Sequence, residues 1–548
     1  MTHHLLAFLL VLAALPAAAV DLTVTTAADI VNGDTSGPDR LKLNPGPDGI
    51  ALREAILAIN TAPGPHRITF SPELAGQTFT ATAPLPAITR YFVTIAGSVD
   101  PDGLPVFTVT ARSGITVSGS HFAVTGLRFS GTGVHIHQGE DFRIEANIFI
   151  QERPESGFAV GVSTDNGSSS ATIRDVTIAG NIFEHYGDVA LGCGVNGTSG
   201  MIENVVISGN SFEDNFFAME LVLTGINGRM SGVRIEGNRF ANNHQGITLN
   251  GSQSLPLPFL PAASNVLENV SISGNVMAGD RNPSILMTGG FEGRRGSILN
   301  TVIANNLITG KASCAICILG GNLPDGGNRV EAVRIVNNTI SVSGTADAVS
   351  VYANTAGGTA NQVTGLAILN TILQVQGSNF TPEVAPDHVR WSLLHPAKRN
   401  GFVGVNGNIE GDPQFANPTQ GDFHLQPGSR AIDAGTGEGA PAMDLECRSR
   451  EGRPDIGAFE AGGRPVAVLR FTMAGSGSGT VSATPSGRDC YGALAYDSGT
   501  TVTLTPTPAT GSVFDGWRGS AACSTGVVAL VESATCVATF KIGGVEPQ

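Results

Sequence analysis

A pattern of alternating branched and polar residues, close to V-x-I-x-G-N-x-F, returns along the middle of the chain. Its clearest copies end at Phe149, Phe183, Phe212 and Phe240. The turn positions are separated by 34, 29, 28, 37, 31, 32 and 33 residues, and they are Asn147, Asn181, Asn210, Asn238, Asn275, Asn306, Asn338 and Thr371. A repeat of this length predicts a stack of similar coils.

Within one repeat, the V-x-I alternation places the branched side chains on one face of a strand. The following Asn stands where the backbone must turn, and Asn tolerates the left-handed conformation that most residues avoid. A second short apolar strand follows each time, as in G-V-H-I from Gly133, D-V-A-L from Asp188 and A-V-S-V from Ala348. Because no coil can bury its apolar face alone, we expect the coils to stack with the turn asparagines forming a hydrogen-bonded ladder.

The repeat resembles that of right-handed parallel β-helix proteins such as pectate lyases and polygalacturonases. This resemblance implies an all-β fold with the β-helix over residues 111–410. Composition agrees with it: the 548 residues include 71 Gly, and only 14% are charged and 6% aromatic, as in a turn-rich β protein with a narrow aliphatic core.

Residues 20–110 are predicted to form an N-terminal cap and the first coils. Residues 49–60 form an amphipathic helix in this prediction, with Leu52, Ala55, Ile56 and Ile59 on a common face. The A-L-R-E-A-I sequence and the later R-I-T-F-S-P-E-L resemble the N-terminal module with a C-S-L-R-E-A-I motif of secreted bacterial β-helix proteins. Ile50 and Ala51 stand where that family often has Cys and Ser, so its local crosslink has no cysteine here.

Two further units follow the repeats. The sequences D-P-Q-F, G-D-F-H-L-Q-P-G-S-R-A-I-D-A-G and D-L-E-C-R-S-R-E-G-R-P-D-I-G-A-F-E within residues 411–462 resemble the choice-of-anchor Q region, which ends secreted β-helices ahead of surface anchors. Residues 463–548, with G-S-V-F-D-G-W-R-G, resemble the bacterial surface repeat related to the internalin B-repeat. Trp517 is expected in the core of that small β domain, with a carbohydrate-stacking platform as the alternative.

The first 19 residues read as a signal peptide, because the apolar run Leu5–Leu15 is followed by Pro16 and three alanines that supply a cleavage site. No other stretch is long and apolar enough to span a bilayer, so the mature chain is expected to be secreted or at the cell surface. The net charge of −15 argues against nucleic acid or anionic membranes as partners, since both need clustered cations.

Seven cysteines fit export to an oxidising compartment. A disulfide is expected to close the terminal domain, joining Cys536 to Cys490 or Cys523. Cys314 and Cys317 form a C-x-x-C sequence, but residues three apart on a strand point to opposite faces. With Cys193 they are therefore expected to be packing residues rather than a metal or redox site.

Candidate chemistry is sparse. Enzymes on the scaffold that the repeat resembles work beside the second strand, whose outward residues include one carboxylate, Glu220, whereas a glycosidase needs two facing carboxylates about 5–9.5 Å apart. A lyase needs a base and a cation to neutralise the uronate, and the nearest cations are Arg281, Arg294, Arg295 and Lys311, outside any recognisable lyase motif. The catalytic candidates are Glu184, His185, Asp188, Asp214 and Glu220.

The leading hypothesis is an exported, non-catalytic β-helix protein that serves in surface adhesion, carbohydrate binding or extracellular scaffolding. The alternative is a polysaccharide lyase or glycoside hydrolase acting on an extracellular glycan through the five candidates above. A third reading is a purely structural spacer. No cofactor is identified, Ca²⁺ is the ion that a lyase would use, and the expected partner is an extracellular polysaccharide or surface component.

Overall fold

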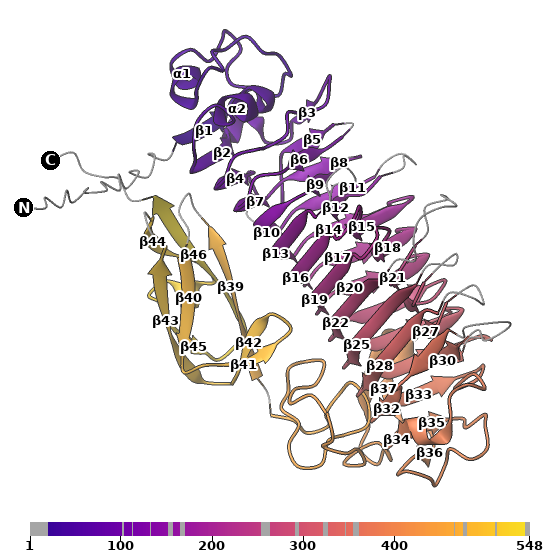
Figure 1. Cartoon of the computed structure of the whole chain (residues 1–548). Helices are drawn as coiled ribbons and strands as arrows, with labels where there is room; N and C mark the ends of the chain where they lie inside the picture. The colour runs from indigo at the N-terminus through magenta and orange to yellow at the C-terminus, as the bar shows by residue number, and fades with distance from the viewer. Residues whose placement is uncertain are drawn as a thin grey trace, which may run out of the picture.

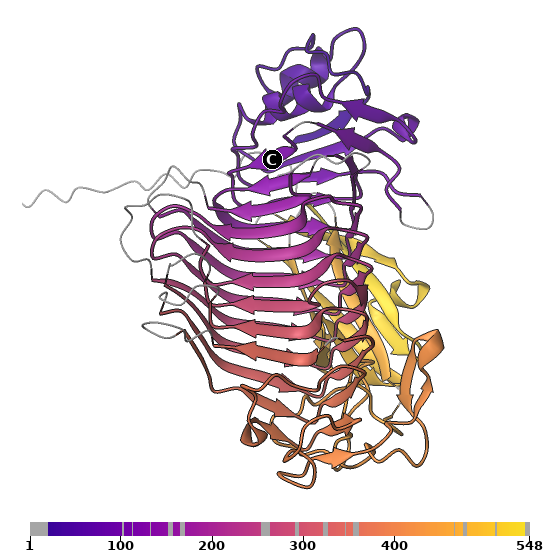
Figure 2. The same ribbon diagram turned by 90° about the vertical axis from the view of Figure 1, so that its right-hand side faces the viewer.

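The computed structural model is an all-β protein in which a right-handed parallel β-helix is followed by a small β domain that lies beside the stack of coils (Figure 1). This confirms the predicted fold class. The coils stack along one axis from the N-terminal cap onwards (Figure 2). The structure describes residues 20–100, 104–111, 113–131, 133–151, 157–164, 170–253, 264–290, 295–321, 327–345, 347–353, 361–464, 466–474, 479–509 and 512–542. The predicted signal peptide, residues 1–19, lies outside these ranges.

Three parallel sheets wrap the core, and a typical coil gives one strand to each. Sheet A contains β1 (Val20–Val24), β2 (His66–Phe70), β4 (Val93–Ala96), β7 (Phe122–Thr125), β10 (Gly139–Glu145), β13 (Thr172–Ala179), β16 (Met201–Ser208), β19 (Arg229–Glu236), β22 (Asn265–Ser273), β25 (Gly296–Ala304), β28 (Arg329–Val336), β31 (Gln362–Thr364), β32 (Ala367–Leu369) and β34 (Val389–Arg390). Sheet B contains β3 (Thr78–Thr80), β5 (Thr108–Thr110), β8 (Arg128–Ser130), β11 (Ile148–Ile150), β14 (Ile182–Glu184), β17 (Ser211–Glu213), β20 (Arg239–Ala241), β23 (Val276–Asp280), β26 (Leu307–Gly310), β29 (Thr339–Val342), β33 (Ile372–Val375), β35 (Leu393–His395) and β36 (Ile409–Glu410). Sheet C contains β6 (Ile115–Val117), β9 (Val134–Ile136), β12 (Val160–Ser163), β15 (Val189–Val195), β18 (Phe217–Leu223), β21 (Gln245–Asn250), β24 (Ile285–Thr288), β27 (Cys314–Leu319) and β30 (Asp347–Tyr352).

The V-x-I strands form sheet A and the second predicted strands form sheet C. The residues after each turn Asn form the short strands of sheet B. The sequence repeat did not predict this third sheet. Their phenylalanines point inward and stack in one column, with ring centroids 4.7–5.0 Å apart from Phe129 through Phe149, Phe183 and Phe212 to Phe240. Sheet B therefore supplies the aromatic part of a core that is otherwise branched aliphatic.

The turn asparagines form a ladder at the corner between sheets A and B. In each step from Asn147 to Asn338, the backbone N–H and the Nδ2 of one Asn both donate to Oδ1 of the next, at 2.9–3.1 Å. The ladder ends where the Asn338 N–H donates to Thr371 Oγ1 at 3.5 Å. The left-handed conformation, however, belongs to the preceding residue, such as Gly209 (φ 62°) or Gly237 (φ 64°), and not to the ladder Asn as expected from sequence. The reason is that the Asn side chain must point inward along the stack, so the residue before it makes the turn.

The other two corners use the same device. Between sheets B and C, the Asn215 N–H and Nδ2 donate to Asn243 Oδ1 at 3.0 Å, and Asn243 donates to Asp280 Oδ1 at 3.1 and 3.3 Å. Between sheets C and A, Asn328 donates twice to Asn361 Oδ1 at 3.1 Å. Side-chain amides thus satisfy the backbone groups that each buried corner would otherwise leave unpaired.

The N-terminal cap contains α1 (Pro38–Leu43), α2 (Leu52–Ile59) and the short helix η1 (Pro72–Leu74). The predicted helix forms as α2, with the four predicted apolar residues fully buried. Glu54 accepts hydrogen bonds from the backbone N–H groups of Asn32, Gly33 and Ala51 at 2.7–2.9 Å. Arg53 donates twice to the carboxylate of Asp29, at 2.7 and 2.8 Å. Arg53 and Glu54 therefore hold the loop that precedes α2 in place.

Residues 411–462, called the exit region here, fold back over the outer face of sheet B. After η2 (Pro386–His388) and the last coil, this region contains β37 (Phe415–Asn417), η3 (Pro418–Gln420) and β38 (Asp422–Leu425). Its phenylalanines and Ile456 pack against outward residues of the coils, among them Leu307, Ile372 and Leu393. The coils near the end of the stack are thereby shielded from solvent.

A buried ionic network explains the long motif of the exit region. Arg450 donates to Glu460 Oε2 at 2.8 Å and to Asn305 Oδ1 of the coils at 3.0 Å. Asp444 accepts from the backbone N–H groups of residues 446, 448 and 460, and Asp455 accepts from those of residues 433 and 461. Burial raises the pKa of Glu460 to about 7 even though Arg450 lowers it. These charged residues hold loops in place and face each other.

The terminal domain contains two antiparallel-rich sheets. One has β41 (Arg488–Cys490), β42 (Ala493–Asp497), β39 (Val466–Ala474), β46 (Ala534–Ile542) and β44 (Ser512–Gly519). The other has β40 (Gly479–Thr484), β43 (Thr500–Pro508) and β45 (Val527–Leu530), and η4 (Ala521–Cys523) precedes β45. Trp517 is half-buried against this core, with its ring centroid 5.1 Å from that of Phe514.

Disulfides join Cys523 to Cys536 and Cys447 to Cys490. Of the two partners expected for Cys536, the structure thus selects Cys523, and Cys490 instead crosslinks the terminal domain to the exit region. A third disulfide joins Cys314 to Cys317, so the expectation that these two residues point apart is wrong. Their Cα atoms are 6.0 Å apart, whereas three extended residues would span about 10 Å, so the backbone between them at the start of β27 is not fully extended. Cys193 is free and buried, as a packing residue.

Candidate functional site

The outer face of sheet C presents two columns of outward residues, each continuous from coil to coil. The first column is Thr116, His135, Gly161, Gly192, Glu220, Thr248, Leu286, Cys317 and Ser350. The second is Ser163, Gly194, Val222, Asn250, Thr288, Leu319 and Tyr352. These columns hold one carboxylate, Glu220, and neither Lys nor Arg.

Two glycines in the first column are covered by rings. A Cβ at Gly161 would lie 2.7 Å from Nδ1 of His135, and one at Gly192 would lie 2.4 Å from Cε1 of Phe158. Phe158 is nevertheless 40% exposed, so its ring rests against the backbone at Gly192 and still presents part of its surface to solvent. An apolar ring lying on a flat sheet is a surface on which a sugar ring can stack.

A second exposed ring stands at the edge of sheet C. Phe216, 43% exposed, stacks on His244 of the next coil with centroids 4.4 Å apart and planes at 11°. His244 Nε2 is 2.7 Å from Asn282 Nδ2, which holds the imidazole in place. The two positions immediately precede their strands, β18 and β21, so the pair forms a small aromatic wall at the B–C corner.

Glu220 is half-buried in the first column. Burial raises the pKa of its carboxyl, and the nearby charge of Asp188 raises it further. In register, Glu220 faces Gly192 on one neighbouring coil and Thr248 on the other. Asp188 stands four residues before Gly192, and its carbonyl accepts from the Phe217 N–H, so it lies beside the start of β18 and not opposite Glu220.

The other sequence candidates do not converge on Glu220. Glu184 pairs in register with Ile150 and Glu213 in sheet B. His185 and Asp214 are exposed at the B–C corner with φ values of 63° and 54°, in a column continued by Asn242 and Gly279. Gly279 adopts the same positive φ without a side chain, so this column of residues serves the backbone turn and not a shared side-chain function.

The candidate lyase cations also lie apart from the columns. Arg281, Arg295 and Lys311 are exposed on connections between sheets, and Arg294 lies outside the described residues. The part of the chain that the structure describes has no group of three or more His, Cys, Asp or Glu side chains placed to hold a metal ion.

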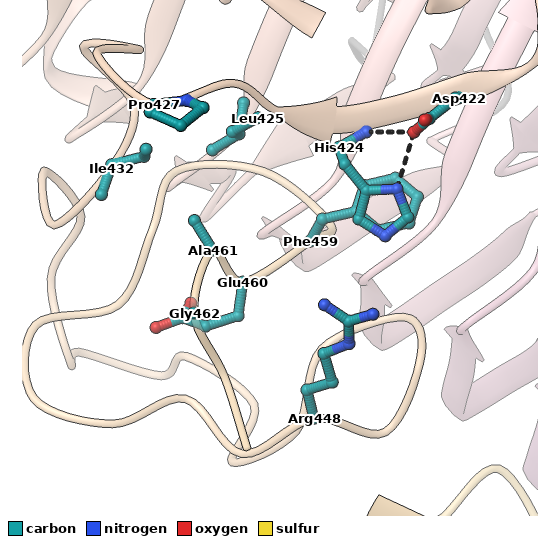
Figure 3. Close-up of a pocket in the computed structure, with 10 residues that line it drawn as sticks. All are labelled: Asp422, His424, Leu425, Pro427, Ile432, Arg448, Phe459, Glu460, Ala461 and Gly462. Carbon is teal, nitrogen blue, oxygen red and sulfur yellow. Dashed lines mark hydrogen bonds and ion pairs between the residues drawn. The ribbon is translucent and has the colours of Figure 1, made fainter. Parts of the chain in front are cut away.

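A cavity of about 500 Å³ lies in the exit region (Figure 3). His424 stacks obliquely on Phe459 in its wall, with Nδ1 2.7 Å from Asp422 Oδ1 and Nε2 3.0 Å from Glu446 Oε2. Burial lowers the pKa of His424, but the hydrogen bonds to Glu446 and Asp422 outweigh it and the net shift is upward. Arg448 pairs with the same Glu446 at 3.0 Å. The ionisable groups of this wall thus bind each other and hold the hairpin against the following loop.

The sequence predicted Glu220 and the outward residues of sheet C as the place to look for a site, but it did not point to Phe158, Phe216 or His424. The available signal was positional: an aromatic residue directly before the apolar strand of sheet C, as in G-F-A-V-G-V and N-F-F-A-M-E-L. An aromatic residue beside an apolar run is read as core, so the signal does not by itself separate a buried ring from an exposed one.

A family model of the divergent InlB B-repeat domain matches residues 470–543, within the terminal domain. Among curated proteins, none matches this chain.

Solved structures with similar coils include the A-module of the mannuronan C-5 epimerase AlgE4 from Azotobacter vinelandii, at 14% identity and a TM-score of 0.35 over 65% of this chain and 90% of that one. Pectate lyase Pel9A is similar at 15% identity and a TM-score of 0.30, over 80% and 96% of the two chains. A PL6 alginate lyase in complex with a trisaccharide gives 10% identity and a TM-score of 0.33 over 75% and 91%. At such identities the similarity concerns the fold alone.

The described residues contain no helix with the length and apolar character needed to cross a bilayer.

Proposed function

We propose that this is an exported, surface-associated protein whose sheet C binds an extracellular glycan without cleaving it. The observation that carries the proposal is the solvent-facing ring of Phe158, which lies on the backbone at Gly192 directly beside the half-buried Glu220. An aromatic platform next to a hydrogen-bond acceptor is a typical arrangement for holding a sugar by its apolar face and its hydroxyl groups.

Binding without turnover follows from the register. A general acid and a general base must flank one bond, yet Glu220 has glycine and threonine as its neighbours in the column. A lyase would also need cations in the two columns of sheet C to neutralise a uronate, and these columns hold neither Lys nor Arg.

Hydrolysis is the second candidate function, and one observation favours it. Burial and the nearby charge of Asp188 raise the pKa of Glu220, and a carboxyl with a raised pKa is what the general acid of a glycosidase requires. Asp188 belongs to the neighbouring coil but stands four residues before Gly192, the residue that faces Glu220 in register, and this favours the binding role.

The modular layout supports a place outside the cell. The terminal domain matches the InlB B-repeat family model, and three disulfides suit an oxidising compartment. The N-terminal module with its L-R-E-A helix and the choice-of-anchor Q-like exit region would then cap and close a β-helix used for adhesion, glycan binding or scaffolding at the surface.

The test is a screen of neutral, acidic and amino-sugar polysaccharides against the purified chain, with and without Ca²⁺, read both as binding and as release of reducing ends or unsaturated products. We expect binding to at least one glycan and no products. Phe158→Ala and Gly192→Ala should each weaken binding about tenfold, the second because a Cβ there displaces the ring. Gly194→Ala is the matched control, since its Cβ would meet nothing closer than 3.7 Å.

Cleavage that is lost in Glu220→Gln or Asp188→Asn would establish the hydrolase instead. Cleavage that survives both changes would show that the active site lies away from these two carboxylates. Failure to bind any glycan would refute the proposal.

A further inference from the structure

The disulfide between Cys314 and Cys317 differs from the other two in the length of chain that it closes. Its cysteines are 3 residues apart, whereas those of the other bonds are 43 and 13 residues apart. The entropy that a crosslink removes from the unfolded chain grows with the length of the closed loop. The Cys314–Cys317 bond therefore contributes least to stability in this way, and a purely structural role explains it least well.

The neighbouring coils hold the backbone at this bond in place. β27 lies between β24 and β30, and Ile316–Leu319 pair in parallel register with both strands. Breaking the bond between the two sulfurs removes none of these backbone hydrogen bonds. The disulfide can therefore open and close again while the β-helix stays folded.

The two sulfurs of this bond differ in their access to solvent. Cys314 is buried, whereas Cys317 faces outward between Leu286 and Ser350 in the first column of sheet C and is partly exposed. The other four bonded cysteines and the free Cys193 are each at most 7% exposed. Because an attacking thiolate must reach a sulfur atom, exchange with an external thiol can begin at Cys317 far more readily than at the other cysteines.

Beyond the proposed glycan binding, we propose that the Cys314–Cys317 disulfide is an exchange site for a small thiol such as glutathione. The thiol loses its proton to solvent and its sulfur attacks Sγ of Cys317. The bond to Cys314 breaks as the new S–S bond forms, so Cys317 carries the small thiol as a mixed disulfide. Cys314 leaves as a thiolate and takes up a proton from solvent.

Two outcomes follow from the mixed disulfide. Cys314 can attack Sγ of Cys317 and expel the small thiol, which restores the starting state. A second molecule of the thiol can instead attack the bound one, which releases the oxidised dimer of the small thiol and leaves both cysteines as thiols. In that case two electrons have passed from two small thiols to the protein disulfide. While it lasts, the mixed disulfide places the small thiol on the same column of sheet C as Glu220.

The experiment incubates the purified full chain with increasing reduced glutathione at about pH 8, where part of the thiol is ionised. Acid stops the exchange, free thiols are alkylated in denaturant, and mass spectrometry maps each cysteine. We expect Cys314 and Cys317 to become alkylated at a glutathione concentration about tenfold or more below the one that opens the other two disulfides. Those two bonds also report that the chain is still folded. Opening of all three bonds together, or of the Cys314–Cys317 bond last, would overturn the inference.

Two matched variants test which sulfur exchanges. In Cys314→Ser, oxidised glutathione should form a mixed disulfide with the remaining Cys317 thiol of the folded protein. In Cys317→Ser, the buried Cys314 should stay unmodified under the same conditions, as should Cys193 in both variants. An unmodified Cys317, or equal modification of Cys314 and Cys317, would refute the assignment of Cys317 as the reactive sulfur.

Discussion

At the corner between sheets B and C, a carboxyl group ends a ladder of amides. Asp280 is 1% exposed, its Oδ1 accepts from Asn243, and its Oδ2 has no hydrogen-bond partner among the described residues. Burial raises the pKa of Asp280 to about 7 from 3.8. The folded protein therefore binds a proton that the unfolded chain releases over this range, so stability falls as pH rises from about 4 to about 7 and stays lower above it.

Asp280→Asn removes this titration and keeps an oxygen for Asn243. We expect the melting temperature to rise at pH 8 and to change little at pH 4.5, with a ceiling of about 4 kcal/mol from three pKa units. Calorimetry at the two pH values checks it, with Asp21→Asn as an exposed control. A variant no more stable than the parent at pH 8 would show that Asp280 is not strained by its charge.

The ladder asparagines give a second prediction at this scale. Asn238 accepts two hydrogen bonds from Asn210 and donates to Asn275 Oδ1 and to the carbonyl of Ile207. Asn238→Leu leaves these buried groups unpaired and should cost roughly 1–3 kcal/mol in the free energy of unfolding. Denaturant melts would measure the loss, and an unchanged midpoint would mean that the ladder adds nothing to stability.

At the scale of elements, the cap helix shows how a short motif fixes a loop. Glu54 is fully buried and uses both carboxylate oxygens to accept three backbone N–H groups. In Glu54→Gln, an amide NH₂ replaces one acceptor and faces a donor, so we expect a loss of about 2–3 kcal/mol. Hydrogen exchange should accelerate at Asn32 and Gly33 while the distant coils stay protected. Glu73→Gln, on the exposed η1, is the control.

The strands also show how much of the fold can be predicted from the sequence. Sheet A and sheet C strands could be predicted because alternation and the Asn spacing repeat in every coil. Sheet B was missed as a sheet because a three-residue strand such as β14 or β17 is too short for a period of two to stand out. At the candidate site, Glu220 was found because strand alternation turns it outward, whereas the exposure of Phe158 depends on Gly192 of a neighbouring coil.

At the scale of the whole molecule, Tyr491 anchors the terminal domain to the side of the β-helix. Its ring occupies the space above Gly274, where a Cβ would lie 2.3–2.5 Å from three ring atoms. Its hydroxyl accepts from Asn305 Nδ2 and donates to the carbonyl of Asp444, both at 3.0 Å. Cys490, the residue before Tyr491, forms a disulfide with Cys447 of the exit region. Contacts between residues 186 positions apart leave no periodic trace, so sequence could not reveal this docking.

This docking predicts that the terminal domain does not trail as a free tail. The double variant Tyr491→Ala, Cys490→Ser should release it, which small-angle scattering would detect as a larger radius of gyration and a longer maximum dimension. Tyr91→Ala, an exposed tyrosine in the N-terminal part of the stack, is the control and should leave both quantities unchanged. A parent protein already as extended as the double variant would contradict the docked arrangement.

The central claim is that a glycan lies on the outer face of sheet C. Hydroxyl-radical footprinting with a saturating glycan from the screen tests it most directly, since oxidation reports the exposure of individual rings. We predict that Phe158 and Phe216 become protected on binding, while Tyr91 and Phe92, which are at least half exposed and lie off sheet C, react as before. Binding that leaves Phe158 and Phe216 fully reactive would contradict the account and place the glycan elsewhere on the molecule.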